Sequence, residues 1–520
     1  MLLPACLLID DDQLRQRLDP VESDADTDAD TDADGDTDAD ADLVDADGDG
    51  VLSDADCDDA DVSVYPGSHE AETPGDGVDT DCDGLDVCTD LNCDGWPDLV
   101  VPSAYATDGS VSESAIFYGP FSLAGATDTA YFTTNRSSAV LARDLDGDGF
   151  IDVVFGGDPG TEGDDTYLYW GSATGPGGDP ILLHSNGVYQ VCAEDLDDDG
   201  GLEIVLTCHG ENGAPETDSL VYWADRGYSV SNVTALPTSY GRSCAVRDLD
   251  ADGVEDIVLV NQYDSTSWDI DSYIYWGADD YSTDGRTALQ THGAARTYVD
   301  DLDLDGDDDV FIVNLYSSEE ATYAVDSYVY WNDSGAFSNA SRLALAGLGT
   351  QYAAIADLDG GGAPEIITSS VTDGTSQADL PVTVWDGEGG LSTSASVAMD
   401  GGKLVSAADL DGDLDLDLVV SSQCADGATF LCDVMVFWNE GGFDTSNSQG
   451  LPGEWPLRHA VGDLDGDGWP DIFVANAFDG TAHSSTSYVY FGSAGGFDTT
   501  QPASLPVQGV YGSPLVVGGG

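Results

Sequence analysis

Positive charge is almost absent from this sequence. Only 12 of its 520 residues are Lys or Arg, against 101 Asp and Glu, so the formal net charge is −89 at pH 7, and the one lysine is Lys403. Such a chain repels nucleic acid and anionic lipid, which excludes both as direct partners of the folded part. The sequence also lacks any run of 18 apolar residues, so we expect no membrane-spanning helix.

Signatures of common catalytic sites are lacking too. The six histidines show no metal-ligand spacing, and there is no GxSxG motif, no HExxH motif and no phosphate-binding glycine loop. We therefore expect that the protein is not an enzyme.

The abundant residues favour strands and loops. The acid is mostly Asp and is accompanied by 63 glycines, a combination that favours turns over helices. Chains this charged are often disordered, but 41% of the residues are hydrophobic, and ten Trp and 23 Tyr are present. The composition predicts an all-β fold with many acidic loops.

The first 44 residues are expected to precede the folded part. In residues 1–19, Leu3-Pro4-Ala5-Cys6 resembles the cleavage box of a bacterial lipoprotein signal, in which Cys6 is acylated, although the charged start and most of the apolar stretch are missing. Either the start codon is assigned too late or the match arises by chance. Residues 20–44 are a low-complexity Asp/Ala/Thr linker, expected to be disordered and extended because its charges repel one another.

Residues 45–87 form a motif region with calcium-ligand spacing. Oxygen-bearing side chains fall at positions 1, 3, 5, 9 and 12 of a loop with glycine at position 6, as in an EF-hand loop. The final acid is Asp instead of the usual Glu, which predicts modest affinity. The predicted ligands are Asp45, Asp47, Asp49, Ser53 and Asp56.

The same region continues DCDDADVSVYPGSHEAETPGDGVDTDCDGLD. This stretch resembles a cysteine-containing metal-binding motif that precedes many surface proteins of myxobacteria. A further cysteine that is common in that family is replaced here by Glu72-Thr73-Pro74. The resemblance therefore implies a disulfide between Cys57 and Cys82.

From residue 88 to residue 520 the chain is an internal repeat. A DLDGDG-type motif recurs every 51 to 56 residues, beginning at Asp90, Asp144, Asp195, Asp248, Asp301, Asp357, Asp409 and Asp463. In each unit an apolar strand follows the motif, then a polar loop, an aromatic strand such as TYLYWG or SYVYFG, and a weaker fourth strand. Four strands in a unit of this length form one blade of a β-propeller. The sequence predicts about eight four-stranded blades, or seven if the degenerate unit at Asp357 forms no blade.

The two ends of the repeat region suit a closed ring. The unit at Asp90 has no apolar strand before its motif, whereas VQGVYGSPLVV at 507–517 is a strand with no motif after it. A propeller closes its ring to hide its edge strands. We expect this C-terminal strand to complete the first blade.

The acidic motifs have the spacing of cation ligands. Carboxylates at i, i+2, i+4 and i+8 converge around one ion when the glycine at i+5 allows a sharp turn, and Ca²⁺ takes six to eight such oxygens, whereas Mg²⁺ keeps more water. The competing interpretation is a set of solvated acidic turns without metal. The predicted ligand sets are Asp90, Asn92, Asp94 and Asp98; Asp144, Asp146, Asp148 and Asp152; Asp195, Asp197, Asp199 and Glu203; Asp248, Asp250, Asp252 and Asp256; Asp301, Asp303, Asp305 and Asp309; Asp357, Asp359 and Glu365; Asp409, Asp411, Asp413 and Asp417; and Asp463, Asp465, Asp467 and Asp471. The set at Asp357 has Gly361 in place of its third ligand, so we expect that site to be empty or weak.

Residues 88–517 resemble the FG-GAP/VCBS repeat family, the propellers of integrin α chains and of many bacterial surface proteins. The literal Phe-Gly and Gly-Ala-Pro signatures are replaced by stretches such as YWGSATG and YFGSAGGF. The resemblance implies a calcium-binding β-propeller, and the departure weakens the analogy with ligand binding by integrins.

The cysteines of the repeat region suggest an oxidising compartment. Cys88 and Cys93 close a small loop, and Cys424 and Cys432 flank a hairpin loop. Cys192 and Cys208 lie symmetrically about one acidic turn, so we expect them to pair and to leave Cys244 over. Pairing of Cys208 with Cys244 is the alternative.

These features predict an extracellular or cell-surface propeller, such as an outer-membrane lipoprotein of a Gram-negative bacterium, that acts as a monomeric adhesion or ligand-binding module. The partner would be a surface glycan or protein, contacted by Tyr263, Trp268, Phe478 and His483 in the loops 261–271 and 476–487. The competing interpretation is that these residues only cap the blades.

Two other functions stay open. One is a structural or display protein of the envelope without a specific ligand. The other, less favoured, is a polysaccharide-active enzyme, which would need basic residues in a cleft. The candidates for that role are Arg226, Arg242, Arg247, Arg286 and Arg296.

Overall fold

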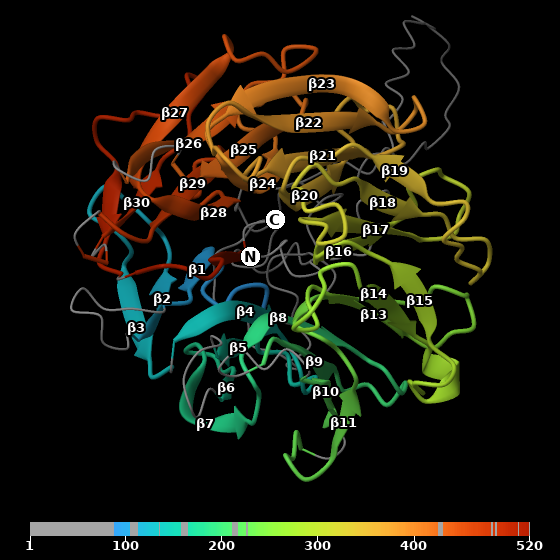
Figure 1. Cartoon of the computed structure of the whole chain (residues 1–520). Helices are drawn as coiled ribbons and strands as arrows, with labels where there is room; N and C mark the ends of the chain where they lie inside the picture. Colours follow the sequence, from blue (N-terminus) through green and yellow to red (C-terminus); the bar gives the residue numbers. More distant parts are fainter. Residues whose placement is uncertain are drawn as a thin grey trace, which may run out of the picture.

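The chain forms a closed ring of β-sheets around a central axis (Figure 1). The computed structural model describes residues 88–518 apart from 104–112, 135, 158–164, 211–216, 225–226, 425–429, 480–481, 484–485 and 508. The predictions for the signal region, the linker and the motif region therefore lie outside the described residues, as do those for Cys6, Asp45, Asp47, Asp49, Ser53, Asp56, Cys57, Cys82 and Arg226. Within the described part, no helix is long and apolar enough to span a membrane.

Eight antiparallel sheets of four strands make up the ring. The strands of the first four sheets follow one another, sheet by sheet, from the inner to the outer strand. They are β32 (Leu515–Val517), β1 (Asp98–Val101), β2 (Ser114–Tyr118) and β3 (Asp128–Phe132); β4 (Ser137–Arg143), β5 (Asp152–Gly157), β6 (Thr166–Trp170) and β7 (Gly177–Leu183); β8 (Val188–Glu194), β9 (Glu203–Cys208), β10 (Ser219–Tyr222) and β11 (Val233–Leu236); and β12 (Gly241–Arg247), β13 (Asp256–Asn261), β14 (Asp271–Tyr275) and β15 (Thr287–Gln290). The short 3₁₀ helix η3 (Gly277–Asp279) lies between β14 and β15.

The other four sheets have the same order. They are β16 (Ala294–Asp300), β17 (Asp309–Asn314), β18 (Ser327–Tyr330) and β19 (Leu343–Leu345); β20 (Thr350–Ala356), β21 (Glu365–Ser370), β22 (Leu380–Asp386) and β23 (Ser392–Met399); β24 (Gly402–Ala408), β25 (Asp417–Ser422), β26 (Leu431–Phe437) and β27 (Ser448–Glu454); and β28 (Pro456–Gly462), β29 (Asp471–Asn476), β30 (Ser487–Tyr490) and β31 (Ala503–Leu505). The prediction of eight four-stranded blades is confirmed. The seven-blade alternative is wrong, because the degenerate unit at Asp357 forms the blade β20–β23.

The hydrophobic core lies between neighbouring blades. Every residue of the second strands β5, β9, β13, β17, β21, β25 and β29 is buried, because each of these strands is covered by a blade on both faces. For example, Val258 and Val260 of β13 pack in one cluster with Val310 and Ile312 of β17. These strands are the apolar segments that follow the acidic motifs in the sequence.

The C-terminal strand closes the ring as predicted. β32 pairs antiparallel with β1, so that Leu99 is opposite Val516 and Val100 is opposite Leu515. The inner strands β4, β8, β12, β16, β20, β24, β28 and β32 contact one another in succession around the axis. The first blade is therefore built from both ends of the repeat region.

Most inner strands begin with a β-bulge. The register against the second strand shifts near the start of β4, β8, β12, β16, β20, β24 and β28. A bulge inserts an unpaired residue and redirects the side chains beside it. Because the bulges lie on the inner strands, the side chains that they redirect lie near the axis of the ring.

Two predicted disulfides are confirmed and one is wrong. Cys88 bonds to Cys93, and Cys424 bonds to Cys432. Cys192 of β8 bonds to Cys244 of β12, with 6.4 Å between their Cα atoms, and the Cys208 side chain is free and buried. Both Cys192–Cys208 pairing and its alternative, Cys208–Cys244, are therefore wrong.

Strand register explains that correction. In the β8–β9 hairpin, Cys192 is opposite Val205 and Cys208 is opposite Val188, so the two cysteines lie toward different ends of the pair. A disulfide needs Cα atoms within about 7 Å. The bond that forms instead joins the inner strands of two neighbouring blades.

Removing the Cys192–Cys244 bond should weaken the ring. The double variant C192A/C244A should unfold with a free energy lower by about 2–4 kcal/mol, because the unfolded chain regains the freedom of a long closed loop. Urea denaturation of the protein measures this, with C208A as a matched control that removes a buried thiol but no bond. A peptide map of the unreduced protein with Cys192 bound to Cys208 would contradict the assignment.

Candidate metal centres

Each acidic motif forms the turn between the first and second strands of a blade. In the turn after β4, the carboxylate of Asp144 accepts hydrogen bonds from the backbone N–H groups of Asp148 (3.1 Å) and Gly149 (2.8 Å). Gly149 has a φ of +87°, a conformation that favours glycine. In all eight turns the N–H five residues after the first aspartate donates to that aspartate.

One turn departs from the glycine pattern. Leu414 takes the fifth position after Asp409, with a φ of +75° and an exposed side chain. Its N–H still donates to Asp409 at 3.0 Å, so the turn keeps its shape at the cost of backbone strain.

The acid at i+8 holds the blade together. Asp152 is buried at the start of β5, and its Oδ2 accepts the N–H of Leu145 (2.9 Å) while its Oδ1 accepts the N–H of Gly171 (2.6 Å) just after β6. All eight blades repeat both bonds, with distances of 2.7–3.3 Å to the turn and 2.6–3.3 Å to the residue one or two places after the third strand. This acid therefore connects three strands of its blade.

The sequence indicated neither of these hydrogen bonds. We expected the i+8 acid to act as a ligand of a cation in the turn. Its contact beyond the third strand was missed because the residue that donates the backbone N–H is Gly, Ala or Asn at a variable distance, as with Gly171, Ala224 and Asn332. No constant spacing marks that position in the sequence.

Burial and neighbouring negative charge oppose the ionisation of the i+8 acids. Burial, together with the aspartates earlier in the same motif, raises the pKa of Asp98 and Asp471 to about 8. The same causes raise the pKa of Asp152, Glu203, Asp256 and Asp309 to about 7. A cation among the carboxylates would favour their ionised form.

The turns bring predicted ligands within reach of one ion. In several turns three carboxylates each offer an oxygen within 4.8 Å of the others. These groups include Asp144, Asp146 and Asp152; Asp195, Asp197 and Asp199; Asp248, Asp250 and Asp252; Asp301, Asp303 and Asp309; and Asp357, Asp359 and Glu365. The last set gathers even though Gly361 replaces its third ligand.

Unpartnered oxygens at i+2 fit a cation. Asn92 Oδ1, Asp250 Oδ1 and Asp465 Oδ1 are buried and accept no hydrogen bond within the part of the chain that the structure describes. All three occupy the second ligand position of their motif. A buried oxygen without a donor is costly unless something else coordinates it, so the donor set fits a hard cation.

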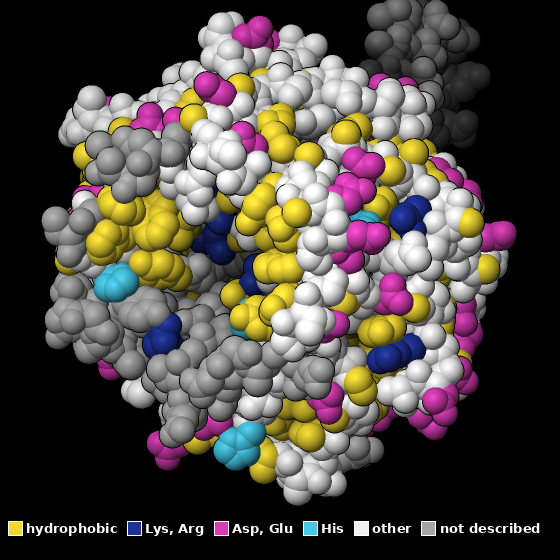
Figure 2. Space-filling model, viewed as in Figure 1, with side chains coloured by type: hydrophobic (Ala, Val, Ile, Leu, Met, Phe, Trp, Pro, Cys, Tyr) yellow, Lys and Arg dark blue, Asp and Glu magenta, His cyan; other side chains and the backbone are white. Residues whose placement is uncertain are grey.

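The predicted ligand-contacting residues lie at the opposite end of the blades. Arg247, at the end of β12, pairs with Asp256 beside an acidic turn, whereas Gly241, at its start, pairs with Asn261 beside the loop that carries Tyr263 and Trp268. Phe478 and His483 lie in the equivalent loop between β29 and β30. Figure 2 shows hydrophobic side chains gathered around a central hollow on this face.

Two aromatic arcs run across this face. The long arc has ring centroids 3.4–6.2 Å apart and contains Tyr189, His209, Tyr240, Tyr263, Trp268, Tyr316 and Tyr323. The short arc contains Phe430, Trp455, Phe478, His483 and Tyr511. The four predicted residues are half-buried members of these arcs. Sequence reasoning missed their partners because these belong to other loops.

The four described arginines among those considered for an enzyme do not form one cleft. Arg247 is paired with Asp308 at 3.0 Å, and Arg286 donates a hydrogen bond of 2.6 Å to the hydroxyl of Tyr275. Arg242 and Arg296 lie together on neighbouring inner strands, where Arg296 Nη1 donates to the Arg242 carbonyl at 3.0 Å.

Comparisons with solved structures give distant likenesses. The Vibrio cholerae biofilm matrix protein Bap1 is similar at 12% identity and a TM-score of 0.44, over 80% of this chain and 91% of that one. An Agrocybe aegerita lectin that recognises non-reducing terminal N-acetylglucosamine is similar at 14% identity and a TM-score of 0.38, over 83% and 96%. None of the curated proteins matches the chain.

Family models match the repeats themselves. The model of the FG-GAP-like repeat matches residues 144–206, 301–368 and 409–474, and that of the FG-GAP repeat matches residues 460–491. Three of these ranges begin at the first aspartate of an acidic turn and end inside the second strand of the next blade. The chain forms an eight-bladed β-propeller, of which residues 144–206, 301–368 and 409–491 match FG-GAP-like repeats.

Proposed function

We propose that this protein is an extracellular or cell-surface propeller that binds Ca²⁺ in its acidic turns and a surface glycan or protein on the opposite face. The observation that carries the proposal is the separation of the two faces. Carboxylate clusters lie at one end of the inner strands, and the aromatic arcs lie at the other. Metal binding can therefore set the shape of the blades without blocking the ligand face.

The turns favour Ca²⁺ for chemical reasons. Their side-chain ligands are all oxygens, and Ca²⁺ accepts such ligands in irregular geometry. When bound, the ion supplies positive charge among acids whose pKa is raised by burial. The chain's own part is to hold the i and i+8 carboxylates in place through backbone N–H groups, which leaves the i+2 oxygen available.

The other parts of the proposal follow from the same features. Three disulfides among the described residues favour an oxidising compartment. Half-buried aromatic rings in polar loops suit stacking on sugar rings or contact with a protein surface. We propose a monomer without enzymatic activity, in which a lipid anchor at Cys6 is the route to a membrane.

Two substitutions in one turn separate metal binding from scaffolding. Asp465→Ala removes an oxygen that accepts no hydrogen bond, so it should lower the melting temperature only with Ca²⁺ present. At a Ca²⁺ concentration of 100 times the dissociation constant, the stabilisation lost is up to about 2.7 kcal/mol. Asp471→Ala removes the acceptor of two backbone N–H groups and should destabilise the protein with or without Ca²⁺. Calorimetry with Ca²⁺ and with EGTA measures both, with the exposed Asp284→Ala as control.

Equal effects of Asp465→Ala in Ca²⁺ and in EGTA would contradict the metal assignment. The acidic turns would then act as solvated loops, and the i+8 bonds alone would maintain the blades.

The ligand face is tested by the aromatic arcs. Trp268→Ala and Phe478→Ala should weaken binding to a glycan array or to outer-membrane extract about tenfold or more, because each removes a ring of one arc. Tyr131→Ala, which removes an exposed ring on the outer strand β3, is the control and should bind normally. Unchanged melting temperatures exclude misfolding. A wild-type protein that binds nothing in Ca²⁺ would favour the structural or display function instead.

A further inference from the structure

Four of the few basic residues converge at one point on the propeller axis. Arg242, Arg296, Lys403 and Arg458 come from the inner strands β12, β16, β24 and β28 and surround Tyr352 of β20. The guanidinium carbons of Arg296 and Arg458 lie 5.6 and 5.2 Å from the Tyr352 ring centroid, and Lys403 Nζ lies 5.7 Å from it. One third of the 12 basic residues thus share a single site.

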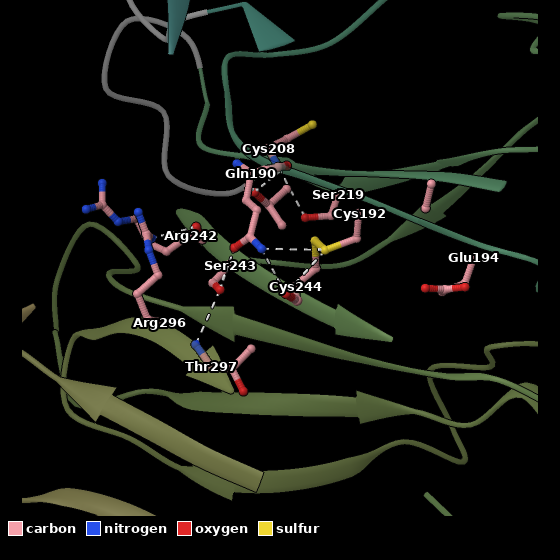
Figure 3. Close-up of a disulfide and its surroundings, with 12 residues drawn as sticks. Gln190, Cys192, Glu194, Cys208, Ser219, Arg242, Ser243, Cys244, Arg296 and Thr297 are labelled. Atoms are coloured by element: carbon pink, nitrogen blue, oxygen red, sulfur yellow. Dashed lines mark hydrogen bonds between the residues drawn. A yellow bond between two sulfur atoms is a disulfide. The ribbon is translucent and has the colours of Figure 1, made fainter. Parts of the chain in front are cut away.

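The β-bulges bring these side chains together. Arg242 and Lys403 lie inside the shifted segments of β12 and β24, and Arg296, Tyr352 and Arg458 come at the end of theirs. Figure 3 shows Arg242 and Arg296 side by side on neighbouring strands, apart from the Cys192–Cys244 bond. Bulges that redirect side chains are common beside binding sites.

Among the described residues, no carboxylate balances this charge. Within the described part of the chain, none of the four basic residues forms a salt bridge. Their hydrogen bonds go to neutral oxygens. These are the carbonyls of Arg242, Ala295 and Leu457, Gln351 Oε1 and the Tyr352 hydroxyl.

Several donors at the site are buried and unpartnered. Arg296 is 2% exposed, and its Nε and Nη2 have no hydrogen-bond partner among the described residues. The same holds for Arg242 Nε and Arg458 Nε. A buried guanidinium without an acceptor is costly, and an oxyanion would satisfy several of these donors at once.

The site is reached from the ligand face. Lys403 and Arg458 are half-buried whereas Arg242 and Arg296 are buried, so the charge lines a mouth and its base. Figure 2 shows Lys and Arg side chains at the central hollow of this face. The acidic turns lie at the other ends of the strands, and salt screens their charge over about 8 Å at physiological ionic strength.

We propose that this cluster on the propeller axis is an oxyanion-binding site for a carboxylate, sulfate or phosphate group. Three guanidinium groups and one ammonium group supply the donors, and Tyr352 supplies a flat surface between them. The group is either a free ion or part of a larger molecule that the aromatic arcs also contact, because the long arc reaches Arg242 through Tyr189 at 3.8 Å. The proposal holds whether or not the aromatic arcs themselves bind a glycan or a protein.

Tyr352 provides a readout inside the site. Burial raises the pKa of this phenol, but Arg458, Lys403, Arg296 and Arg242 outweigh burial and lower the pKa to about 8. Further titratable groups beside the cluster are Tyr298 of β16, His209 near Arg242 and His459 near Arg458. A bound oxyanion would reverse this effect and raise the pKa of Tyr352 toward its ordinary value, so its binding should weaken as the pH rises through about 8.

The experiment titrates the whole calcium-loaded protein with sodium sulfate, sodium acetate and sodium glucuronate against sodium chloride at constant ionic strength, and records heat and tyrosinate absorbance. At least one oxyanion should bind and raise the Tyr352 pKa. Lys403→Gln and Arg458→Gln, at the half-buried mouth of the site, should each weaken binding of that oxyanion about tenfold or more. Arg342→Gln, which removes an arginine stacked on Tyr328, should bind like the wild type.

Each outcome decides a point. If glucuronate binds much more tightly than acetate, the ligand is a carboxylate carried on an acidic sugar. If sulfate binds as tightly as glucuronate, the ligand is a free ion. Oxyanion effects that are the same in Lys403→Gln, Arg458→Gln and the wild type would overturn the proposal. A Tyr352 that is already ionised at pH 7, and insensitive to every oxyanion, would overturn it as well, because the phenolate would then be the counter-charge.

Discussion

A buried acid in every blade is the interaction on which the rest of the propeller depends. The i+8 carboxylate, such as Asp152, accepts one backbone N–H from the acidic turn and another from beyond the third strand. This carboxylate therefore connects three strands, but burial raises its pKa and so opposes its ionisation. The aspartates before it add further negative charge. A cation in the turn is the simplest arrangement that keeps this acid ionised.

The distribution of charge along the inner strands relates the fold to the proposed function. One end of the ring carries the carboxylate turns, and the other carries the aromatic arcs with four basic residues on the axis. A chain of net charge −89 repels anions in general, so an anion can be held only where cations are concentrated. The basic cluster is such a place, and it opens toward the face that carries the aromatic arcs.

The repeats made the fold predictable. Each acidic motif precedes a buried strand, and the orphan strand at 507–517 pairs with β1 because a ring leaves no edge. The acidic turns and the disulfides Cys88–Cys93 and Cys424–Cys432 followed from local spacing, whereas the bond from the i+8 acid to the residue beyond the third strand did not. Contacts between blades did not follow. Cys192 meets Cys244, and Arg242 meets Arg296, across more than fifty residues and through bulges that no sequence pattern marks.

The central claim is that the acidic turns are cation sites that organise the blades. Diffraction from crystals of the calcium-loaded protein, with data collected to reveal anomalous scattering by calcium, tests it most directly. Our account predicts anomalous density inside the turns, coordinated by the i+2 oxygens of residues such as Asp250 and Asp465. Turns that hold only water in saturating Ca²⁺, with the blades unchanged, would contradict it.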